Sequence, residues 1–229
     1  MKNFINIRNI SVKDLKKIIF DAKKRKAKRK KLNYLDPDKD APLKGRFLIQ
    51  MFEKSSTRTR LSFYLAIRQL GGGALNLRKD ELHFGEGGES IHDTAKILSN
   101  YGDIFMFRTD SDKKLQEFKR YIKIPIINGL SPSSHPTQIL SDIFTIEEIK
   151  KQSVHNLNIC WIGDSNNVLN SLIEASVKFS FNLKIGCPKK YEPNKSLINW
   201  AKKNKSKIQI FNDAKKAMLK SDVVFEDKF

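Results

Sequence analysis

The sequence predicts an α/β fold with two doubly wound parallel-sheet domains joined by a long helix. Short apolar runs alternate with amphipathic stretches along most of the chain, as in strands joined by crossover helices. The same alternation begins again after a long helix expected over 135–150. We therefore expect a first domain over 1–150 and a second over 151–229, with right-handed crossovers in both.

The elements follow in order along the chain. Ser11 begins the first helix, with Asp14 three residues on as an approximate capping box. A loop over 33–44 precedes a buried strand at 47–52 and a helix that ends at three glycines, 71–73. In the first domain, the remaining strands are expected at 75–77, 103–108 and 125–130, and the remaining helices from Ser90, at 111–121 and at 135–150. In the second domain, strands are expected at 156–164, 181–187, 207–211 and from 223, and helices through 179, at 196–204 and at 214–219.

Composition limits the kinds of protein that this chain can be. Hydrophobic residues make up 39% and charged residues 30% of the 229 residues, as is typical of soluble globular chains. No apolar run reaches about 18 residues and no secretion signal is visible, so we expect no membrane partner. Cys160 and Cys187 lie in apolar, strand-like contexts, which favours a reduced, cytoplasmic location without disulfides.

The net charge of +19 raises the question of a polyanionic partner. Residues 23–31 are nearly all Lys and Arg. They indicate either a surface that binds nucleic acid or a solvated helix end, whose cations interact favourably with the C-terminal end of the helix dipole. Aromatic residues are not interleaved with the lysines as a stacking platform would need. We therefore favour the helix end, expect no nucleic-acid partner, and note that the charge could help to attract a small anionic substrate.

The hydroxyl and arginine motif Ser55–Arg60 is the stretch around which the chain is organised. It follows the buried strand at 47–52 and opens a helix, where free backbone N–H groups and the helix dipole favour an anion. Its two arginines match phosphate oxygens. A capping serine followed by solvated arginines is the simpler alternative, but three hydroxyls interleaved with two arginines exceed what a cap needs. The motif therefore predicts an anion site.

Two further stretches point to the same ligand crevice. Arg108 ends a strand, and residues just past the carboxyl ends of parallel strands line ligand sites; a surface arginine is an equal alternative. His135 and Gln138 stand at the start of the helix that contains Pro136 near its N-terminus. Both side chains can therefore point at one spot above that helix N-terminus.

These motifs together resemble one enzyme family. The stretch 52–60 resembles the carbamoyl phosphate loop of the aspartate and ornithine carbamoyltransferases, and 135–138 is similar to their second signature. The stretch 161–169, with its paired asparagines, the turn at 188–193 and Glu226-Asp227 resemble the ornithine branch. The resemblance covers nearly the whole chain from residue 5.

The resemblance implies how carbamoyl phosphate is bound. Its phosphate would be held by Ser56, Thr57, Arg58 and Thr59, and its carbamoyl end by Arg108, His135 and Gln138. The catalytic candidates are then Arg58, Arg108 and His135. His83 is similar in position to a loop residue that the family contributes to a neighbouring subunit's site, which implies a homotrimer with shared sites.

The resemblance also implies the second substrate and the reaction. Asn167 and Asp227 would hold the α-carboxylate and α-amino group of L-ornithine, whose δ-amine attacks carbamoyl phosphate to give L-citrulline and phosphate. No cofactor is needed, and no metal-ligand cluster is visible in the sequence. Family members run further, so we expect the second domain to be C-terminally short and incomplete. A sister enzyme acting on putrescine or another amine, and a non-catalytic carbamoyl phosphate-binding remnant, are the alternatives.

Overall fold

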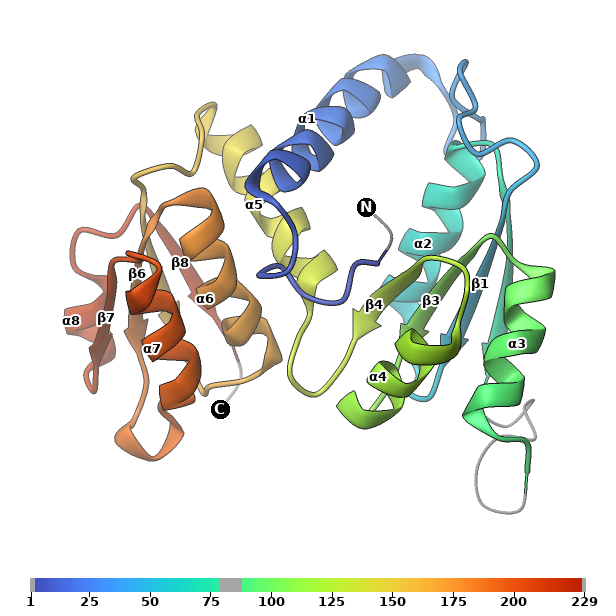
Figure 1. Cartoon of the computed structure of the whole chain (residues 1–229). Coiled ribbons are helices and arrows are strands. Elements are labelled where there is room, and N and C mark those ends of the chain that lie inside the picture. The colour runs from blue at the N-terminus through green and yellow to red at the C-terminus, as the bar shows by residue number, and fades with distance from the viewer. Residues whose placement is uncertain (1–2, 79–87, 228–229) are drawn as a thin grey trace. The chain divides into compact units, whose positions relative to one another are not determined.

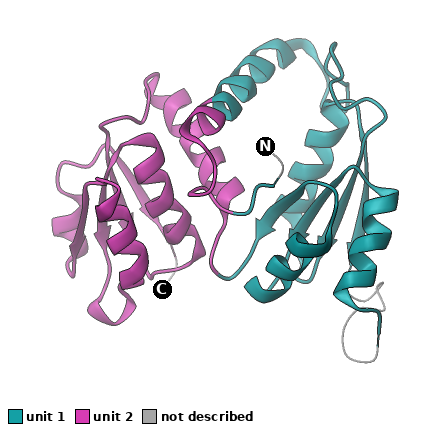
Figure 2. Ribbon diagram, in the orientation of Figure 1, with its two compact units in different colours: residues 1–5, 17–132 teal, residues 6–16, 133–229 magenta. Residues whose placement is uncertain are grey.

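The computed structural model describes residues 3–78 and 88–227, which form two compact units (Figure 2). Unit 1 comprises Met1–Ile5 and Lys17–Pro132, and unit 2 comprises Asn6–Lys16 and Ser133–Phe229. By their internal contacts, the long helix over 136–150 and the segment 6–16 both belong to unit 2. The division at residue 150 stays a prediction.

Unit 1 is built on a parallel sheet with strand order β2-β1-β3-β4 (Figure 1). Its strands are β1 (Phe47–Phe52), β2 (Gly73–Arg78), β3 (Ile104–Arg108) and β4 (Ile126–Leu130), and its helical segments are α1 (Val12–Lys28, whose first residues belong to unit 2), η1 (Arg29–Lys31), α2 (Thr57–Gln69), α3 (Ile91–Tyr101) and α4 (Asp112–Tyr121). The central position of β1 and β3 brings their carboxyl ends side by side, with Phe52 opposite Arg108.

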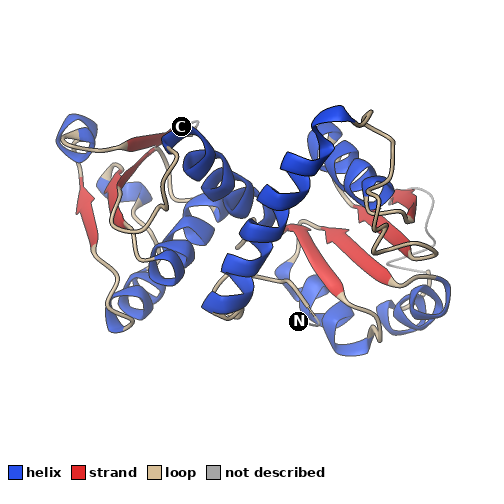
Figure 3. Ribbon diagram, turned by 90° about the horizontal axis from the view of Figure 1, so that it is seen from above, coloured by secondary structure: helices blue, strands red, loops and turns tan. Residues whose placement is uncertain are grey.

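The two faces of this sheet bury different side chains, because successive residues of a strand point to opposite sides. Ile49 and Met51 of β1 pack in a cluster with α3 and α4. Leu48 and Phe52 pack on the other face in a cluster with Ile67 of α2. Helices therefore cover both faces, as Figure 3 shows for the strands of each unit.

Unit 2 repeats the design with strand order β7-β6-β5-β8. Its elements are α5 (Pro136–Lys150), β5 (Asn158–Ile162), α6 (Asn167–Phe179), β6 (Asn182–Gly186), η3 (Lys189–Tyr191), α7 (Lys195–Lys203), β7 (Ile208–Phe211), α8 (Ala214–Met218) and β8 (Val223–Glu226). Cys160 and Ile162 of β5 pack with Ala217 of α8, and the alternating residues Ile159 and Trp161 are buried on the other face.

A buried carboxylate fastens the N-terminal segment to unit 2. Glu174 of α6 accepts hydrogen bonds from the backbone N–H groups of Ile7 and Arg8 at 3.0 and 3.1 Å. Its side chain is 7% exposed, and the Arg8 guanidinium lies 3.3 Å from the second carboxylate oxygen. Two hydrogen bonds and one ion pair to one carboxylate thus attach Ile7 and Arg8 to unit 2, the unit to which residues 6–16 belong.

The predicted fold class is confirmed, since both units are α/β with four parallel strands. The predicted caps are also present: Ser11 Oγ accepts from the N–H of Asp14, and Ser90 Oγ from that of Asp93. Within 3–78 and 88–227, no helix is both long enough and apolar enough to cross a membrane.

Candidate functional site

The anion motif lies where the fold concentrates positive partial charge. Ser56 is the N-cap residue of α2, with an extended backbone at φ −156°, and Thr57 is the first helical residue. The free N–H groups of this helix end therefore lie beside the carboxyl ends of β1 and β3. This is the place in an open parallel sheet where ligands bind.

Arg108 connects β3 to this helix end. Its Nη1 donates to Ser56 Oγ at 3.1 Å and to Thr59 Oγ1 at 3.0 Å. The side chain of Ser56 makes no capping hydrogen bond to α2, and its hydroxyl oxygen accepts from Arg108 instead. The structure thus brings Ser56, Thr57, Thr59 and Arg108 together, and the alternative of a solvated surface arginine at 108 does not hold.

The electrostatics of Arg108 favour an anionic ligand. Burial, and next the positive charge of Arg58, lower the pKa of the Arg108 guanidinium below its usual range. The Nε of Arg108 is buried and has no hydrogen-bond partner in the described part of the chain. Two cations that repel each other, and a buried donor without an acceptor, are features that an anionic ligand would satisfy.

Two further residues predicted for carbamoyl phosphate, His135 and Gln138, belong to unit 2. His83 lies outside the described residues. His135 is the N-cap residue of α5 in unit 2, and its N–H donates to Ser171 Oγ of α6 at 2.9 Å. Gln138, in the first turn of α5, donates to Asp142 at 2.8 Å. His135 and Gln138 therefore share one helix N-terminus, as the spacing predicts.

The residues predicted for the amino acid meet in unit 2 at the carboxyl edge of its sheet. Asn166 is the N-cap residue of α6: its Oδ1 accepts from Val168 N–H at 2.9 Å, and its Nδ2 donates to Asp227 Oδ2 at 2.5 Å. Asn167 is the first residue of that helix, and Asp227 follows β8. Asn167 and Asp227 are thus brought close together by Asn166.

Two residues that matter for this geometry were not among the predicted site residues. Asn166 orients Asp227, and the pair of adjacent asparagines in the sequence is the signal that could have identified it. Glu53 lies behind the anion motif with a side chain that is only 2% exposed. Its signal is an acidic residue within an otherwise basic and hydroxyl-rich loop.

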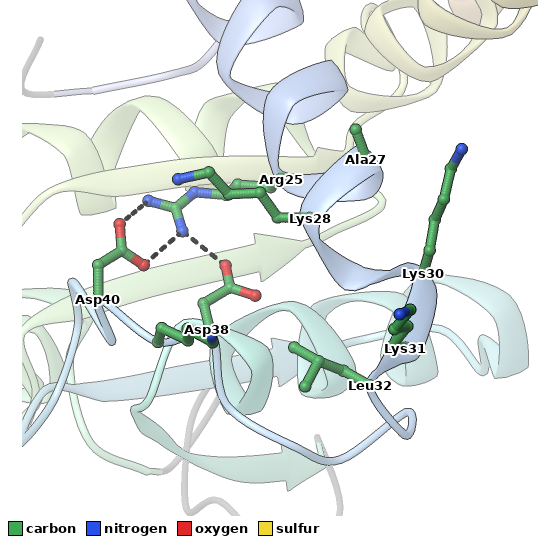
Figure 4. A pocket seen from close by; sticks show the side chains of 9 residues that line it. Arg25, Ala27, Lys28, Lys30, Lys31, Leu32, Asp38 and Asp40 are labelled. Atoms are coloured by element: carbon green, nitrogen blue, oxygen red, sulfur yellow. Dashed lines mark hydrogen bonds and ion pairs between the residues drawn. The ribbon is translucent and has the colours of Figure 1, made fainter.

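A pocket of about 590 Å³ lies at the end of α1, between residues of the basic run at 23–31 and the segment 38–40 (Figure 4). Arg25 lies between two carboxylates there, 2.5 Å from Asp38 and 3.0 Å from Asp40. Arg29 pairs with the other oxygen of Asp38 at 2.7 Å and donates to two backbone carbonyls. These pairs use the two arginines structurally, which supports the helix-end interpretation.

No metal-binding cluster occurs among the residues that the structure describes. Cys160 and Cys187 are both free thiols and both buried. Burial raises the pKa of each thiol, so neither is a reactive thiolate at neutral pH.

Comparison with known proteins identifies the family. Residues 2–148 match the aspartate/ornithine carbamoyltransferase carbamoyl-P binding domain, and residues 155–229 match the Asp/Orn binding domain of the same family. The chain belongs to the aspartate/ornithine carbamoyltransferase family. The predicted resemblance and the prediction of a carbamoyltransferase are therefore confirmed.

Individual members of the family are similar over almost the whole chain. The ornithine carbamoyltransferase of Agrobacterium fabrum is 40% identical over 226 residues, which are 99% of this chain and 72% of the relative. A crystal structure of the anabolic ornithine carbamoyltransferase of Campylobacter jejuni has 36% identity and a TM-score of 0.88, covering 100% of this chain and 74% of that one. The catalytic subunit of M. jannaschii aspartate transcarbamoylase, at 27% identity and a TM-score of 0.85, covers 99% and 73%.

Proposed function

We propose that the chain transfers the carbamoyl group of carbamoyl phosphate to the δ-amine of L-ornithine, giving L-citrulline and phosphate. The observation that carries the proposal is the contact of Arg108 with Ser56 and Thr59 at the N-terminus of α2. The similarity to proteins named ornithine carbamoyltransferase supports ornithine as the acceptor.

Unit 1 supplies the phosphate site in this proposal. Ser56, Thr57 and Thr59 offer hydroxyl and backbone donors, and Arg58 offers a guanidinium beside that of Arg108. Phosphate oxygens would satisfy the donors of α2 and offset the repulsion between the two arginines. The motif is therefore suited to hold the group that leaves in the reaction.

The chemistry needs a nucleophile and a place for negative charge. The neutral δ-amine attacks the carbamoyl carbon, a C–N bond forms, and charge builds on the carbonyl oxygen. Donors from Thr59, Arg108 and His135 stabilise that oxygen, and each donor of this kind contributes about 2.7–4 kcal/mol in measured cases. The C–O bond to phosphate then breaks, the amine proton goes to the departing phosphate, and Gln138 holds the carbamoyl amide.

Unit 2 supplies the amino-acid site. Asp227 carries the negative charge that an α-ammonium group needs, and Asn167 offers amide donors to an α-carboxylate. The bond from Asn166 to Asp227 holds the carboxylate beside the start of α6. An amine without these two groups, such as putrescine, would leave both ligands unused.

We also propose that the protein assembles as a homotrimer with shared sites. The edge strand β2 exposes Leu75 by 47%, and α2 exposes Leu61 by 51% and Tyr64 by 36%. Apolar side chains on a helix and an edge strand of one unit suit burial against a second copy. The segment with His83 follows β2 directly, which supports a role for His83 in a neighbouring site.

The cytoplasmic location also stays a proposal. Its support is that Cys160 and Cys187 are free thiols, as expected in a reducing compartment.

The experiment that tests the function is an assay for citrulline with the purified chain, carbamoyl phosphate and ornithine. Putrescine in a parallel reaction tests the acceptor, and the Arg58→Ala variant tests the phosphate site. We expect product with ornithine alone and a large loss in the variant. Equal rates with putrescine would contradict the ornithine assignment. No product from a folded chain that still binds carbamoyl phosphate would show a non-catalytic protein.

A further inference from the structure

A buried carboxylate connects the two strands that carry the phosphate site. Glu53 follows β1 directly and stands three residues before Ser56, and its side chain is 2% exposed. Its backbone N–H donates to the carbonyl oxygen of Arg108 at 3.0 Å. Glu53 is therefore hydrogen-bonded to Arg108, and it also directly precedes the loop that carries Ser56.

The carboxylate itself binds the segment that follows β3. Its Oε2 accepts hydrogen bonds from the hydroxyl of Thr109 and from the N–H of Asp110, the latter at 3.4 Å. Its Oε1 accepts from Lys114 Nζ of α4 at 2.6 Å. Thr109 is fully buried, and its own N–H donates to Leu130 of β4 at 3.0 Å. One side chain thus joins the ends of β1 and β3 and the first turn of α4.

Among the residues that the structure describes, the Glu53 carboxylate of this cluster bonds to the segment that follows β3. It acts on the site through the backbone: Glu53 precedes the loop, and Thr109 follows Arg108. The bonds from Arg108 to Ser56 and Thr59 require the two strand ends to keep their separation. A misplacement of about 1 Å at a distance from the chemistry can cost about 10²-fold in rate.

We propose that Glu53, with Lys114 and Thr109, is a positioning cluster that sets Arg108 against the phosphate loop. The inference rests on the proposed function and names residues that act through Arg108 without touching the substrate. A buried charge must be paired to be tolerated, and here the pairing partners all follow the strand that ends in Arg108. Loss of the charge frees that strand end from the loop.

The structure offers a matched control at the other end of the same two strands. Asp103 precedes β3 and accepts from the N–H of Phe47 at 2.8 Å and from Arg46 at 2.7 Å. It therefore also joins β1 to β3 by a carboxylate, but at the edge away from Arg108. We therefore expect Asp103→Asn to weaken the same strand pair without moving the site.

The experiment compares Glu53→Gln, Lys114→Met and Asp103→Asn with the parent chain, by steady-state kinetics well below their melting temperatures. We expect Glu53→Gln and Lys114→Met to raise the KM for carbamoyl phosphate at least 10-fold and to lower kcat, with a much smaller change in the KM for ornithine. Asp103→Asn should leave all three constants unchanged.

Two results would overturn the positioning role: unchanged kinetics in Glu53→Gln, or the same kinetic losses in Asp103→Asn. The affinity for carbamoyl phosphate, measured by calorimetry on the same variants, separates this inference from the proposed function. If the parent chain makes no citrulline, the function fails, and a 10-fold weaker binding by Glu53→Gln still supports the positioning cluster. Equal affinities would reject it.

Discussion

Glu174 allows a quantitative test of how the N-terminal segment is held to unit 2. The Glu174→Ala substitution removes the acceptor of the Ile7 and Arg8 N–H groups. Ile7 is fully buried, so its N–H cannot reach water instead, whereas Arg8 lies at the surface. A buried donor left without a partner costs about 1–3 kcal/mol, and we expect the free energy of unfolding of unit 2 to fall by about that amount.

The assay can follow this unit alone. The two tryptophans of the chain, Trp161 and Trp200, both belong to unit 2, so their fluorescence in urea reports its unfolding. Arg8→Ala is the control: the arginine side chain is 46% exposed, and partly exposed ion pairs contribute about 0–1 kcal/mol. Equal stability of Glu174→Ala and the parent chain would refute the reasoning.

The same carboxyl group predicts a pH dependence. Burial raises the pKa of Glu174 above the ordinary 4.5, and the N–H and charge of Arg8 only partly offset this. A raised pKa means that the folded chain binds the proton of Glu174 more tightly than the unfolded chain does. Binding of this proton therefore stabilises the folded chain fully below the pKa of the unfolded state, and the stabilisation is lost as the pH rises through the pKa of the folded state. Glu174→Gln does not titrate. The stability of the parent relative to this variant should therefore fall as the pH rises above the ordinary pKa of a glutamate, and a constant difference would contradict the burial argument.

Three further outcomes follow from the contacts described above. Arg108→Met should lower kcat/KM about 10²–10³-fold in the citrulline assay, because it removes an oxyanion donor and the anchor of the loop hydroxyls. Asn166→Ala should raise the KM for ornithine about 10-fold or more with little change for carbamoyl phosphate, because Asp227 loses a charge-assisted bond of about 1.5–3 kcal/mol. Asp38→Ala should destabilise unit 1 by about 3 kcal/mol in thermal melts, because its buried carboxylate pairs with two arginines, whereas the exposed Asp40→Ala should change stability little.

The sequence identifies elements well where the signal is local. The strand at 47–52 and the helix that follows were predicted because an apolar run and a hydroxyl-rich start are properties of neighbouring residues. The caps at Ser11 and Ser90 are of the same kind, since each partner lies three residues away. Periodicity reports which side chains are buried, and the capping residues report where a helix begins.

Contacts between distant segments were not predictable in this way. No pattern in the sequence says that β1 lies between β2 and β3, or that Phe52 lies opposite Arg108. For the same reason, Glu53 gives no sign in the sequence that its partners are 56 to 61 residues away. Such pairs depend on strand order, which the hydrophobic pattern leaves open. The position of Arg108 at the end of a strand predicted the same crevice as the loop, and the family resemblance implied one ligand for both, but neither gave the strand order.

The direction of the helices explains why this basic chain uses its arginines in two different ways. Arg25 and Arg29 lie at the C-terminal end of α1, where the helix dipole favours cations, and carboxylates of the same unit pair with both. Arg58 and Arg108 lie at the N-terminal end of α2, where the dipole disfavours cations, and burial, and next the charge of Arg58, lowers the pKa of Arg108. The fold pairs the first two arginines with carboxylates, and in the proposed function an anion pairs with the second two. In a parallel sheet, the N-termini of the crossover helices lie at the carboxyl edge of the sheet. A pair of arginines at this edge therefore lowers the stability of the fold, but it is well placed to bind an anion.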